Sequence, residues 1–193
     1  MGPPHRGNRH GRSELARQAV LEAADDLLAE RGFAGVTIEG IAARAGVAKQ
    51  TIYRWWPSKV DVLLEAFTQD MAENLTPPDH GDLDRDLRDH LARVAAFLTD
   101  SDPGAVFRAL AGQAQHDPEL ATRLRTDYLS QQRERDRLPL ERAVHRGQLP
   151  HDLDLDLAVD QLVGPIYYRV LVTGEPATSE FTDHLVARFL NQH

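Results

Sequence analysis

The stretch TIEGIAARAGVAKQTIYRWWPSK, residues 37–59, contains the clearest structural signal of this chain. Its first half has apolar residues at helical spacing, and Gly46 can adopt the positive φ that a sharp turn requires. In the second half, Ile52 and Trp56 lie four residues apart and therefore share the inner face of another short helix. Pro57 ends that helix, because proline pushes the preceding residue out of the helical conformation. Two short helices joined by a tight glycine turn predict a helix-turn-helix, whose second helix can enter the major groove of DNA.

The outer face of the second helix favours contacts with DNA. Its hydrogen-bond donors, acceptors and aromatic ring suit base edges and phosphates, and they are Lys49, Gln50, Thr51, Tyr53 and Arg54. We predict that Trp56 points inward and that Trp55 points outward, where its indole N–H can be donated to a phosphate. Lys59, at the start of the next helix, is a point charge for the same DNA strand. Taken alone, this periodicity is equally typical of a solvated helix face.

Charge is distributed unevenly along the chain. Residues 1–59 carry a net charge of +3 and residues 60–193 a net charge of −11, which together give −8. A basic beginning on an acidic remainder indicates that the first part meets a polyanion. Residues 1–12 have no apolar periodicity and predict a flexible basic arm. The arginines of this arm are Arg6, Arg9 and Arg12. They either reach a minor groove of DNA or belong to a merely disordered tail.

The remainder of the chain is predicted to be helical, which makes the fold class all-α. Apolar residues recur at helical spacing over residues 13–31, 58–76, 83–98, 154–173 and 179–190. Asp102-Pro103 and Asp117-Pro118 have the cap-plus-proline pattern of two further helix starts, and Gly164-Pro165 should kink the helix over 154–173. The predicted architecture is a three-helix helix-turn-helix domain followed by a second helical domain, with about nine helices in total.

Two longer segments resemble one protein family. Residues 37–59, preceded by AVLEAADDLLAERGFAGV, resemble the N-terminal domain of TetR/AcrR-family transcriptional regulators over about residues 13–67. The segment GQLPHDLDLDLAVDQLVGPIYYRVLVTGEP resembles the dimerising end of one C-terminal group in this family. The resemblance implies an all-helical homodimer, a palindromic operator in double-stranded DNA and a ligand pocket. The domains expected are a flexible basic arm (1–12), a helix-turn-helix DNA-binding domain (13–59), a connecting helix (60–76) and a ligand-binding and dimerisation domain (80–193).

Carried onto the matching positions, the resemblance implies that Lys49 and Gln50 reach bases. The residues that would mainly hold phosphates are Thr37, Thr51, Tyr53, Trp55 and Lys59. Trp55 departs from the family pattern, in which a smaller polar aromatic residue is usual. Gln50 stands where a small residue is frequent, which makes it a candidate determinant of sequence specificity. Pro139 lies in the long seventh helix expected from the family, and it should kink or split that helix.

The C-terminal domain offers two apolar sets of candidate residues. The residues that could line a ligand pocket are Phe67, Met71, Phe97, Phe107, Tyr128 and Tyr168. Each of them, taken singly, is more typical of a protein core. Those that could form a homodimer interface, in a four-helix bundle across a two-fold axis, are Leu162, Ile166, Val170, Phe181, Leu185 and Phe189. The alternative for the second set is that the two late helices only close the core of the protomer.

Several other chemistries lack the residues that they need. The chain has no cysteine, and its nine histidines are scattered without the spacing of an H-E-x-x-H motif. It has no G-x-S-x-G motif, phosphate-binding loop or dinucleotide fingerprint, and DLDLDLAVD lacks the glycine and terminal glutamate of an EF-hand. We therefore predict no enzymatic activity, no cofactor and no metal. No apolar run approaches the roughly 20 residues of a membrane helix, so we expect no membrane partner and a cytoplasmic protein.

The predicted function is that of a sequence-specific DNA-binding transcriptional regulator. We expect a repressor that a small, largely apolar effector releases from a palindromic operator. The effector would tilt the connecting helix and so change the spacing of about 34–36 Å between the two recognition helices of the dimer. One alternative is a regulator of the same fold that answers to a protein partner or acts constitutively. Another is a helical enzyme or carrier that merely contains a helix-turn-helix.

Overall fold

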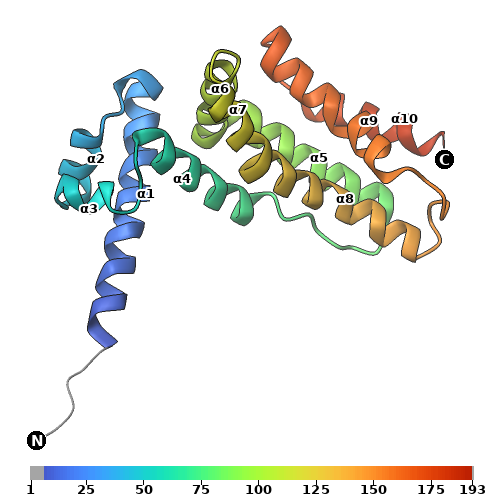
Figure 1. Cartoon of the computed structure of the whole chain (residues 1–193). Coiled ribbons are helices and arrows are strands. Elements are labelled where there is room, and N and C mark those ends of the chain that lie inside the picture. The colour runs from blue at the N-terminus through green and yellow to red at the C-terminus, as the bar shows by residue number, and fades with distance from the viewer. Residues whose placement is uncertain (1–6, 193) are drawn as a thin grey trace, which may run out of the picture. The chain divides into compact units, whose positions relative to one another are not determined.

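The computed structural model describes residues 7–192, and every regular element within them is helical (Figure 1). Ten α-helices occur in this range. One π-helical segment joins two of them and a second extends another, so that nine continuous helical rods result. The all-α fold with about nine helices is therefore confirmed. The chain forms two compact units, residues 1–69 and residues 70–193, which we call the N-terminal and the C-terminal unit. Each unit is described by itself.

The N-terminal unit contains α1 (Gly7–Gly35), α2 (Ile38–Ala45), α3 (Lys49–Tyr53) and the start of α4 (Lys59–Asn74). Helix α1 packs against α2, and α2 packs against α3. The fully buried side chains at the centre of this unit include Val20, Ala24, Ile41, Ile52 and Leu63. Gly32 has a φ of 64°, a left-handed value that glycine tolerates best, and it kinks α1 where the sequence predicts the end of the helix.

The structure corrects the flexible arm predicted for residues 1–12. Helix α1 begins at Gly7, so residues 7–12 belong to a helix. No proline occurs within residues 7–12, and a single glycine costs a helix only about 1 kcal/mol relative to alanine, so nothing in these six residues stops the helix. Residues 1–6, and the arginine side chains for which a minor-groove contact is predicted, lie outside the described part of the chain.

In the C-terminal unit, α5 (Leu83–Asp100) contacts α6 (Asp102–Ala114), α8 (Ser130–His145), α9 (Leu155–Tyr168) and α10 (Ser179–Leu190), and it runs alongside α8 in Figure 1. The apolar face of α5 repeats every three or four residues and is buried along its whole length, at Leu87, Leu91, Val94 and Leu98. This face is the centre of the core. Ser101, rather than the predicted Asp102, caps α6, because its Oγ accepts the N–H of Gly104 at 3.0 Å.

The longest rod of this unit consists of α7 (Pro118–Arg123), the π-helical segment η1 (Leu124–Leu129) and α8. A second π-helical segment, η2 (Arg169–Thr173), continues α9. Pro139 lies inside α8 and Pro165 inside α9, and neither helix is divided there. Of the kink or split predicted at Pro139, the split is therefore wrong, and the kink stays a prediction. Pro139 is buried, and the apolar contacts of this face outweigh the cost of about 3 kcal/mol that proline imposes inside a helix.

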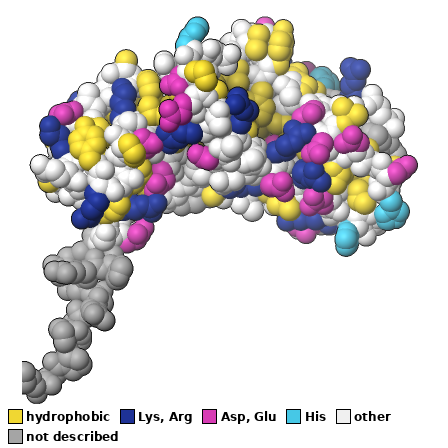
Figure 2. All heavy atoms as spheres, in the orientation of Figure 1, with side chains coloured by type: hydrophobic (Ala, Val, Ile, Leu, Met, Phe, Trp, Pro, Cys, Tyr) yellow, Lys and Arg dark blue, Asp and Glu magenta, His cyan; other side chains and the backbone are white. Residues whose placement is uncertain are grey.

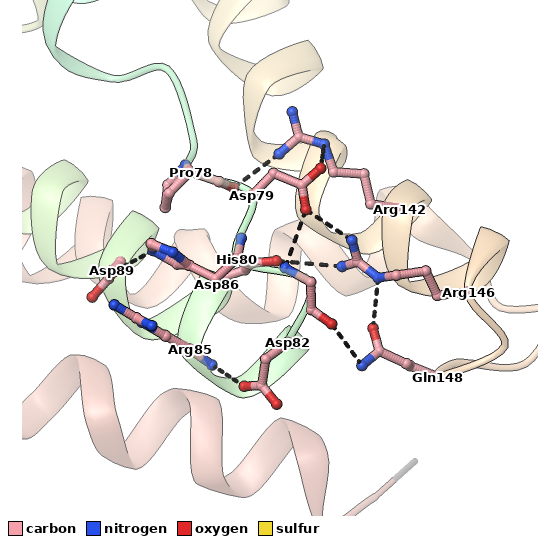
Figure 3. Close-up of polar contacts among 11 residues, drawn as sticks. Pro78, Asp79, His80, Asp82, Arg85, Asp86, Asp89, Arg142, Arg146 and Gln148 are labelled. Atoms are coloured by element: carbon pink, nitrogen blue, oxygen red, sulfur yellow. Dashed lines mark hydrogen bonds and ion pairs between the residues drawn. The ribbon is translucent and has the colours of Figure 1, made fainter.

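A polar group of five side chains ties the segment before α5 to the end of α8, and we call it the junction cluster: Asp79, Asp86, Arg142, Arg146 and Gln148 (Figure 3). The guanidinium of Arg146 donates to Asp79 at 2.8 Å, to Gln148 at 2.9 Å and to the fully buried carboxylate of Asp86 at 3.3 Å. Arg142 donates to the backbone carbonyl of Pro78 at 2.8 Å. The hydrogen bond from Arg146 and the charge of Arg142 lower the pKa of the Asp79 carboxyl below its usual value.

Replacing Arg146 with methionine should lower the free energy of unfolding of the C-terminal unit by about 3 kcal/mol, because the buried Asp86 carboxylate loses its cationic partner. Urea unfolding followed by circular dichroism measures this loss. Arg88→Met is the matched control, since the partners of Arg88, Asp84 and Asp183, are exposed at the surface. Surface ion pairs contribute less than about 1 kcal/mol, so equal losses in the two variants would contradict the role of the buried carboxylate.

Candidate DNA-binding surface and ligand cavity

Helix α3 is held in place by the turns that surround it. The Oγ1 of Thr37 accepts the N–H of Gly40 at 3.0 Å and thereby caps the start of α2. At the other end of α2, Gly46 has a φ of 67° and donates its N–H to the carbonyl of Ala42. The chain then turns into α3, whose inner residue Ile52 is completely buried. These elements form the predicted helix-turn-helix.

The outer face of α3 is polar and open to solvent. Lys49, Gln50 and Tyr53 are exposed there, and Thr51 is half-buried. The ammonium of Lys49 donates to the Glu39 carboxylate of α2 at 3.0 Å. This hydrogen bond raises the pKa of Lys49 and lowers that of Glu39, so both groups are charged at neutral pH. A nucleic acid that contacts Lys49 must therefore compete with Glu39.

The two tryptophans take different positions, as the sequence predicts. Trp56 is 2% exposed, and its Nε1–H is donated to Glu65 at 2.8 Å. The same carboxylate forms an ion pair with Arg17 of α1. Trp55 is half-buried beside the outer face, with the guanidinium of Arg54 4.8 Å from the centre of its ring. Trp56 thus belongs to the core, and Trp55 remains accessible from outside.

Lys59 departs from the predicted role of a free point charge. Its Nζ donates to the carbonyl of Phe33 at 3.0 Å and to the carbonyl of Val36 at 2.9 Å, and it lies 4.6 Å from the centre of the Phe33 ring. The last carbonyls of a helix have no partner within it, and here the lysine supplies one. Two of the three ammonium protons are thus used within the fold, so Lys59 is not a free charge, and its contact with a phosphate stays a prediction for the third proton.

The C-terminal unit contains a cavity of about 630 Å³ between α6, the α7–η1–α8 rod and α9. The apolar side chains along it include Phe107, Leu124, Val159, Val163 and Leu171. The rings of Phe107 and Tyr167 meet edge to face at 5.8 Å, and the hydroxyls of Tyr167 and Tyr128 lie 3.3 Å apart. Burial raises the pKa of both phenols, so they remain protonated at any physiological pH. This volume is typical of sites for small organic molecules.

Of the six residues predicted to line a pocket, Phe107 alone lines this cavity. Tyr128 is buried behind it, with its ring 4.6 Å from that of Phe107. Phe97 borders a separate surface hollow, and Phe67 and Met71 are fully buried and are not among the residues that line the cavity. Tyr168 is 59% exposed, so its predicted lining role is wrong. The neighbouring residue Tyr167 lines the cavity instead, because adjacent helix positions point about 100° apart.

Sequence reasoning missed the polar side of the cavity. Gln132 and Asp136 line it, and both are buried. They lie in the charged stretch QQRERDR, which reads as a solvated helix face. A signal existed nevertheless, because they continue the buried stripe that starts with Leu124 and Tyr128 and ends with Leu140, at steps of four residues. Extending that stripe through polar residues would have identified them.

The predicted dimer residues lie largely inside the protomer. Leu162, Ile166, Val170 and Phe189 are buried, and Phe181 and Leu185 are half-buried. For the four buried residues this favours the alternative that the late helices close the protomer core, whereas an interface role of Phe181 and Leu185 stays a prediction. The opposite face of α9 and η2 is exposed and apolar, at Leu157, Tyr168, Leu171 and Val172. Figure 2 shows hydrophobic side chains gathered over the end of this helix, at the top of the view.

The residues that the structure describes show neither a metal-binding cluster nor a membrane-spanning helix. Among them, no group of three His, Cys, Asp or Glu side chains is placed to hold a metal ion. No helix of the same range is long and apolar enough to span a membrane.

Two family models match the chain, one to each unit. The model described as bacterial regulatory proteins of the tetR family matches residues 20–66, and the model described as a tetracyclin repressor-like C-terminal domain matches residues 77–189. The chain belongs to the TetR family. It is therefore a DNA-binding transcriptional regulator, and this family is one of regulators rather than enzymes.

Relatives in the TetR family align with nearly the whole chain. The HTH-type transcriptional regulator YdeS of Bacillus subtilis is 38% identical over 175 residues, which cover 91% of this chain and 88% of YdeS. The DNA-binding transcriptional repressor TetR of Mycobacteroides abscessus is 30% identical over 179 residues, with 91% and 92% coverage. The crystal structure of the TetR-family regulator SCO0332 superimposes with a TM-score of 0.82 at 36% identity and covers 92% of this chain and 98% of that one.

Proposed function

We propose that the protein is a repressor, which binds a palindromic operator as a homodimer and leaves it when a small, largely apolar effector fills the cavity. The outer face of α3 is the observation that carries this proposal, because exposed hydrogen-bonding side chains lie there on a helix whose inner face is fully buried. Repression, rather than activation, is supported by the relative from Mycobacteroides abscessus, which is named a repressor. A bacterial regulator that binds the chromosome acts in the cytoplasm.

Within the proposed complex, Lys49 and Gln50 read base edges, since they stand at the start of α3, the end that enters the major groove first. The residues that hold phosphates are Thr37, Thr51, Tyr53 and Trp55. Thr37 can do so while it caps α2, because a hydroxyl oxygen accepts from Gly40 and its own proton remains for a phosphate. Lys59 supports the recognition unit from within.

The proposed dimer forms through the exposed face of α9 and η2. The exposed apolar residues lie at the start of α9 and over its end and η2, with the exposed polar residues Asp160 and Gln161 between them, and water is removed from the apolar side chains when two copies pack face to face. Leu157 and Val172, near the two ends of this face, are 54% and 68% exposed. A four-helix arrangement of α9 and α10 with their symmetry mates would bury this face without disturbing the protomer core.

Helix α4 is the proposed connecting element, since its residues 59–74 run across the division between the two units after Gln69. An effector changes the affinity for DNA only if it binds the DNA-free and the DNA-bound conformations with different affinity. The cavity would provide that difference, and a tilt of α4 would change the spacing of the two recognition helices.

Gln50→Ala is expected to relax the preference for one base pair in each half-site, at a cost of about 1–3 kcal/mol for binding to the preferred sequence. Lys49→Ala should cost a similar amount and also flatten the salt dependence by about one unit if the ammonium contacts a phosphate. Selection from a random DNA pool, followed by mobility-shift titrations, measures both effects. Gln131→Ala, an exposed glutamine on α8, is the matched control and should leave the affinity unchanged.

Two results would contradict the proposal at different points. If the wild-type protein selects no sequence from the random pool at moderate salt, the assignment of α3 as a specific reading helix is wrong. If compounds that raise the melting temperature of the protein leave operator affinity unchanged, the effector response is wrong. In that case the alternative of control by a protein partner, or of constitutive binding, takes its place.

A further inference from the structure

The buried polar side of the cavity contains an acceptor that no protein group satisfies. Gln132 is 1% exposed, and its Nε2 donates to Oδ1 of Asp136 at 2.8 Å. A carboxylate accepts hydrogen bonds, so this contact fixes the orientation of the amide with its nitrogen toward Asp136. Within the described residues, no group donates to the Oε1 of Gln132. Desolvated acceptors without a partner are rare in folded proteins, and they deserve an explanation in terms of what binds there.

The carboxylate next to this acceptor is already occupied. Oδ1 of Asp136 accepts from Gln132 and also from Nε2 of His90, which reaches it from α5 at 2.8 Å. His90 is 1% exposed and Asp136 is 5% exposed, so both are removed from solvent. Gln132 and Asp136 both line the cavity, so the polar groups on this side are mainly acceptor oxygens, and a second carboxylate placed beside them would meet repulsion rather than donors.

The cations near the cavity do not supply donors to its buried polar side. Arg133 lines the cavity, but its guanidinium donates to Asp160 at 2.6 Å and to Asp156 at 3.2 Å. Arg125 also lines the cavity, and it is exposed and donates to the hydroxyl of Thr122. Arg135 carries a charge that acts on Tyr128, yet it is not among the lining residues. The cations of the lining are thus exposed or paired, whereas Arg135, outside the lining, has a buried Nη1 that donates to none of the described residues. Among the lining residues, it is Gln132 that carries a buried polar atom without a partner.

From this geometry we infer that the ligand of the cavity is an uncharged, largely aromatic or apolar molecule that bears an O–H or N–H donor, and that it places this donor on Oε1 of Gln132. The inference rests on the proposed function and names the chemical class that the cavity takes. The apolar body lies against Phe107, Val159 and Val163, and the polar head lies beside Gln132 and the Tyr167 hydroxyl. Molecules that carry a carboxylate head are excluded from this orientation by Asp136.

Four compounds with one body test the inference on the full-length protein: 4-phenylphenol, 4-methoxybiphenyl, biphenyl and biphenyl-4-carboxylate. Titration calorimetry should give an affinity for 4-phenylphenol that is about tenfold or more above the affinities of the other three. The methoxy compound retains the oxygen but cannot donate, so it separates hydrogen-bond donation from simple polarity. Equal binding of the ether or the carboxylate, or no binding of 4-phenylphenol up to its solubility limit, would overturn the inference.

Gln132→Met retains the length of the side chain but removes the acceptor, and it should reduce the preference for 4-phenylphenol over biphenyl to about twofold or less. Gln115→Met is the matched control, because Gln115 lines the same cavity from the end of α6 and its preference should stay at the wild-type value. An unchanged preference in a folded Gln132→Met protein contradicts the inference. If that variant fails to fold, the affinities of the four compounds for the wild-type protein still test the inference.

Release of DNA is measured separately, so that the two proposals can fail independently. If 4-phenylphenol binds with the expected preference but operator affinity does not change, the assignment of the cavity stands and the effector response fails. If another compound releases DNA while the four compounds show no preference for a donor, the effector response stands and the assignment of the ligand class fails.

Discussion

Replacing Tyr168 with aspartate is expected to convert the proposed dimer into a folded monomer and to lower the affinity for a palindromic operator by about 10²- to 10⁴-fold. Tyr168 is 59% exposed beside Leu171 and Val172 on the outer face of α9 and η2, so the substitution leaves the protomer core intact. In a dimer, the new carboxylate would have to give up its hydration within an apolar interface. A monomer reads one half-site, and the gain from binding two linked half-sites is lost.

Sedimentation velocity at micromolar concentration, combined with mobility shifts on the full operator and on one half-site, measures both changes. Tyr168→Phe is the control, because it keeps the apolar area and should remain a dimer with wild-type affinity. Ile166→Asp provides a contrast, since Ile166 is fully buried in the protomer and a charge there should unfold the C-terminal unit rather than release a monomer. A Tyr168→Asp protein that still sediments as a dimer would exclude this exposed face as the interface.

The helix-turn-helix could be predicted from sequence because the signals that define it are local. Gly46 ends α2 within one turn of its last apolar residue, and Thr37 caps a helix that starts at the next residue. Ser58 and Asp61 show the same locality, because Asp61 accepts the backbone N–H of Ser58 at 2.8 Å, as the capping pattern indicates. Each of these interactions joins residues at most a few positions apart, so the sequence alone contains both partners.

The role of Lys59 could not be predicted in this way. Its partners are the carbonyls of Phe33 and Val36, which precede it by 26 and 23 residues, and they become available only because α1 ends beside the start of α4 in the folded unit. Nothing near Lys59 in the sequence indicates that its charge is used within the fold. Contacts that depend on where another element ends require the tertiary structure.

Helix α9 shows a second limit, because both of its faces are apolar. Ile166 and Val159 lie on the buried face, whereas Leu157 and Tyr168 lie on the exposed one. Hydrophobic periodicity identifies the inner face of a helix only when the other face is polar. The sequence therefore predicts that an apolar surplus exists on this helix, but it cannot tell which residues the protomer buries and which it leaves for a partner.

The largest loss of stability is expected for Trp56→Ala. Removing a buried tryptophan costs about 3–5 kcal/mol through the cavity that remains, and here Glu65 also loses the indole N–H that it accepts at 2.8 Å. At roughly 0.05–0.15 kcal/mol per residue, the N-terminal unit has only roughly 3–10 kcal/mol of stability in total. The variant should therefore lose most of its folded N-terminal unit near 37 °C, together with binding to every DNA sequence.

Trp55→Ala is the matched control, because the same change of side chain is made one residue away, on the accessible side. It should keep a thermal transition within a few degrees of the wild type, and it should weaken all DNA sequences alike, since an indole N–H that reaches a phosphate carries no base preference. Thermal unfolding by circular dichroism and mobility shifts on specific and random DNA measure the two variants. Equal destabilisation by both substitutions would contradict the division of the pair into a core residue and a surface residue.

Fluorescence gives an independent reading, because Trp55 and Trp56 are the only tryptophans of the chain. Each variant leaves a single indole as reporter. In Trp55→Ala, the emission of the buried Trp56 should be blue-shifted and insensitive to added DNA. In Trp56→Phe, which retains an aromatic ring in the core, the emission of Trp55 should change when operator DNA is added. A DNA response carried by Trp56 rather than by Trp55 would show that the surface which meets DNA is not the outer face of α3.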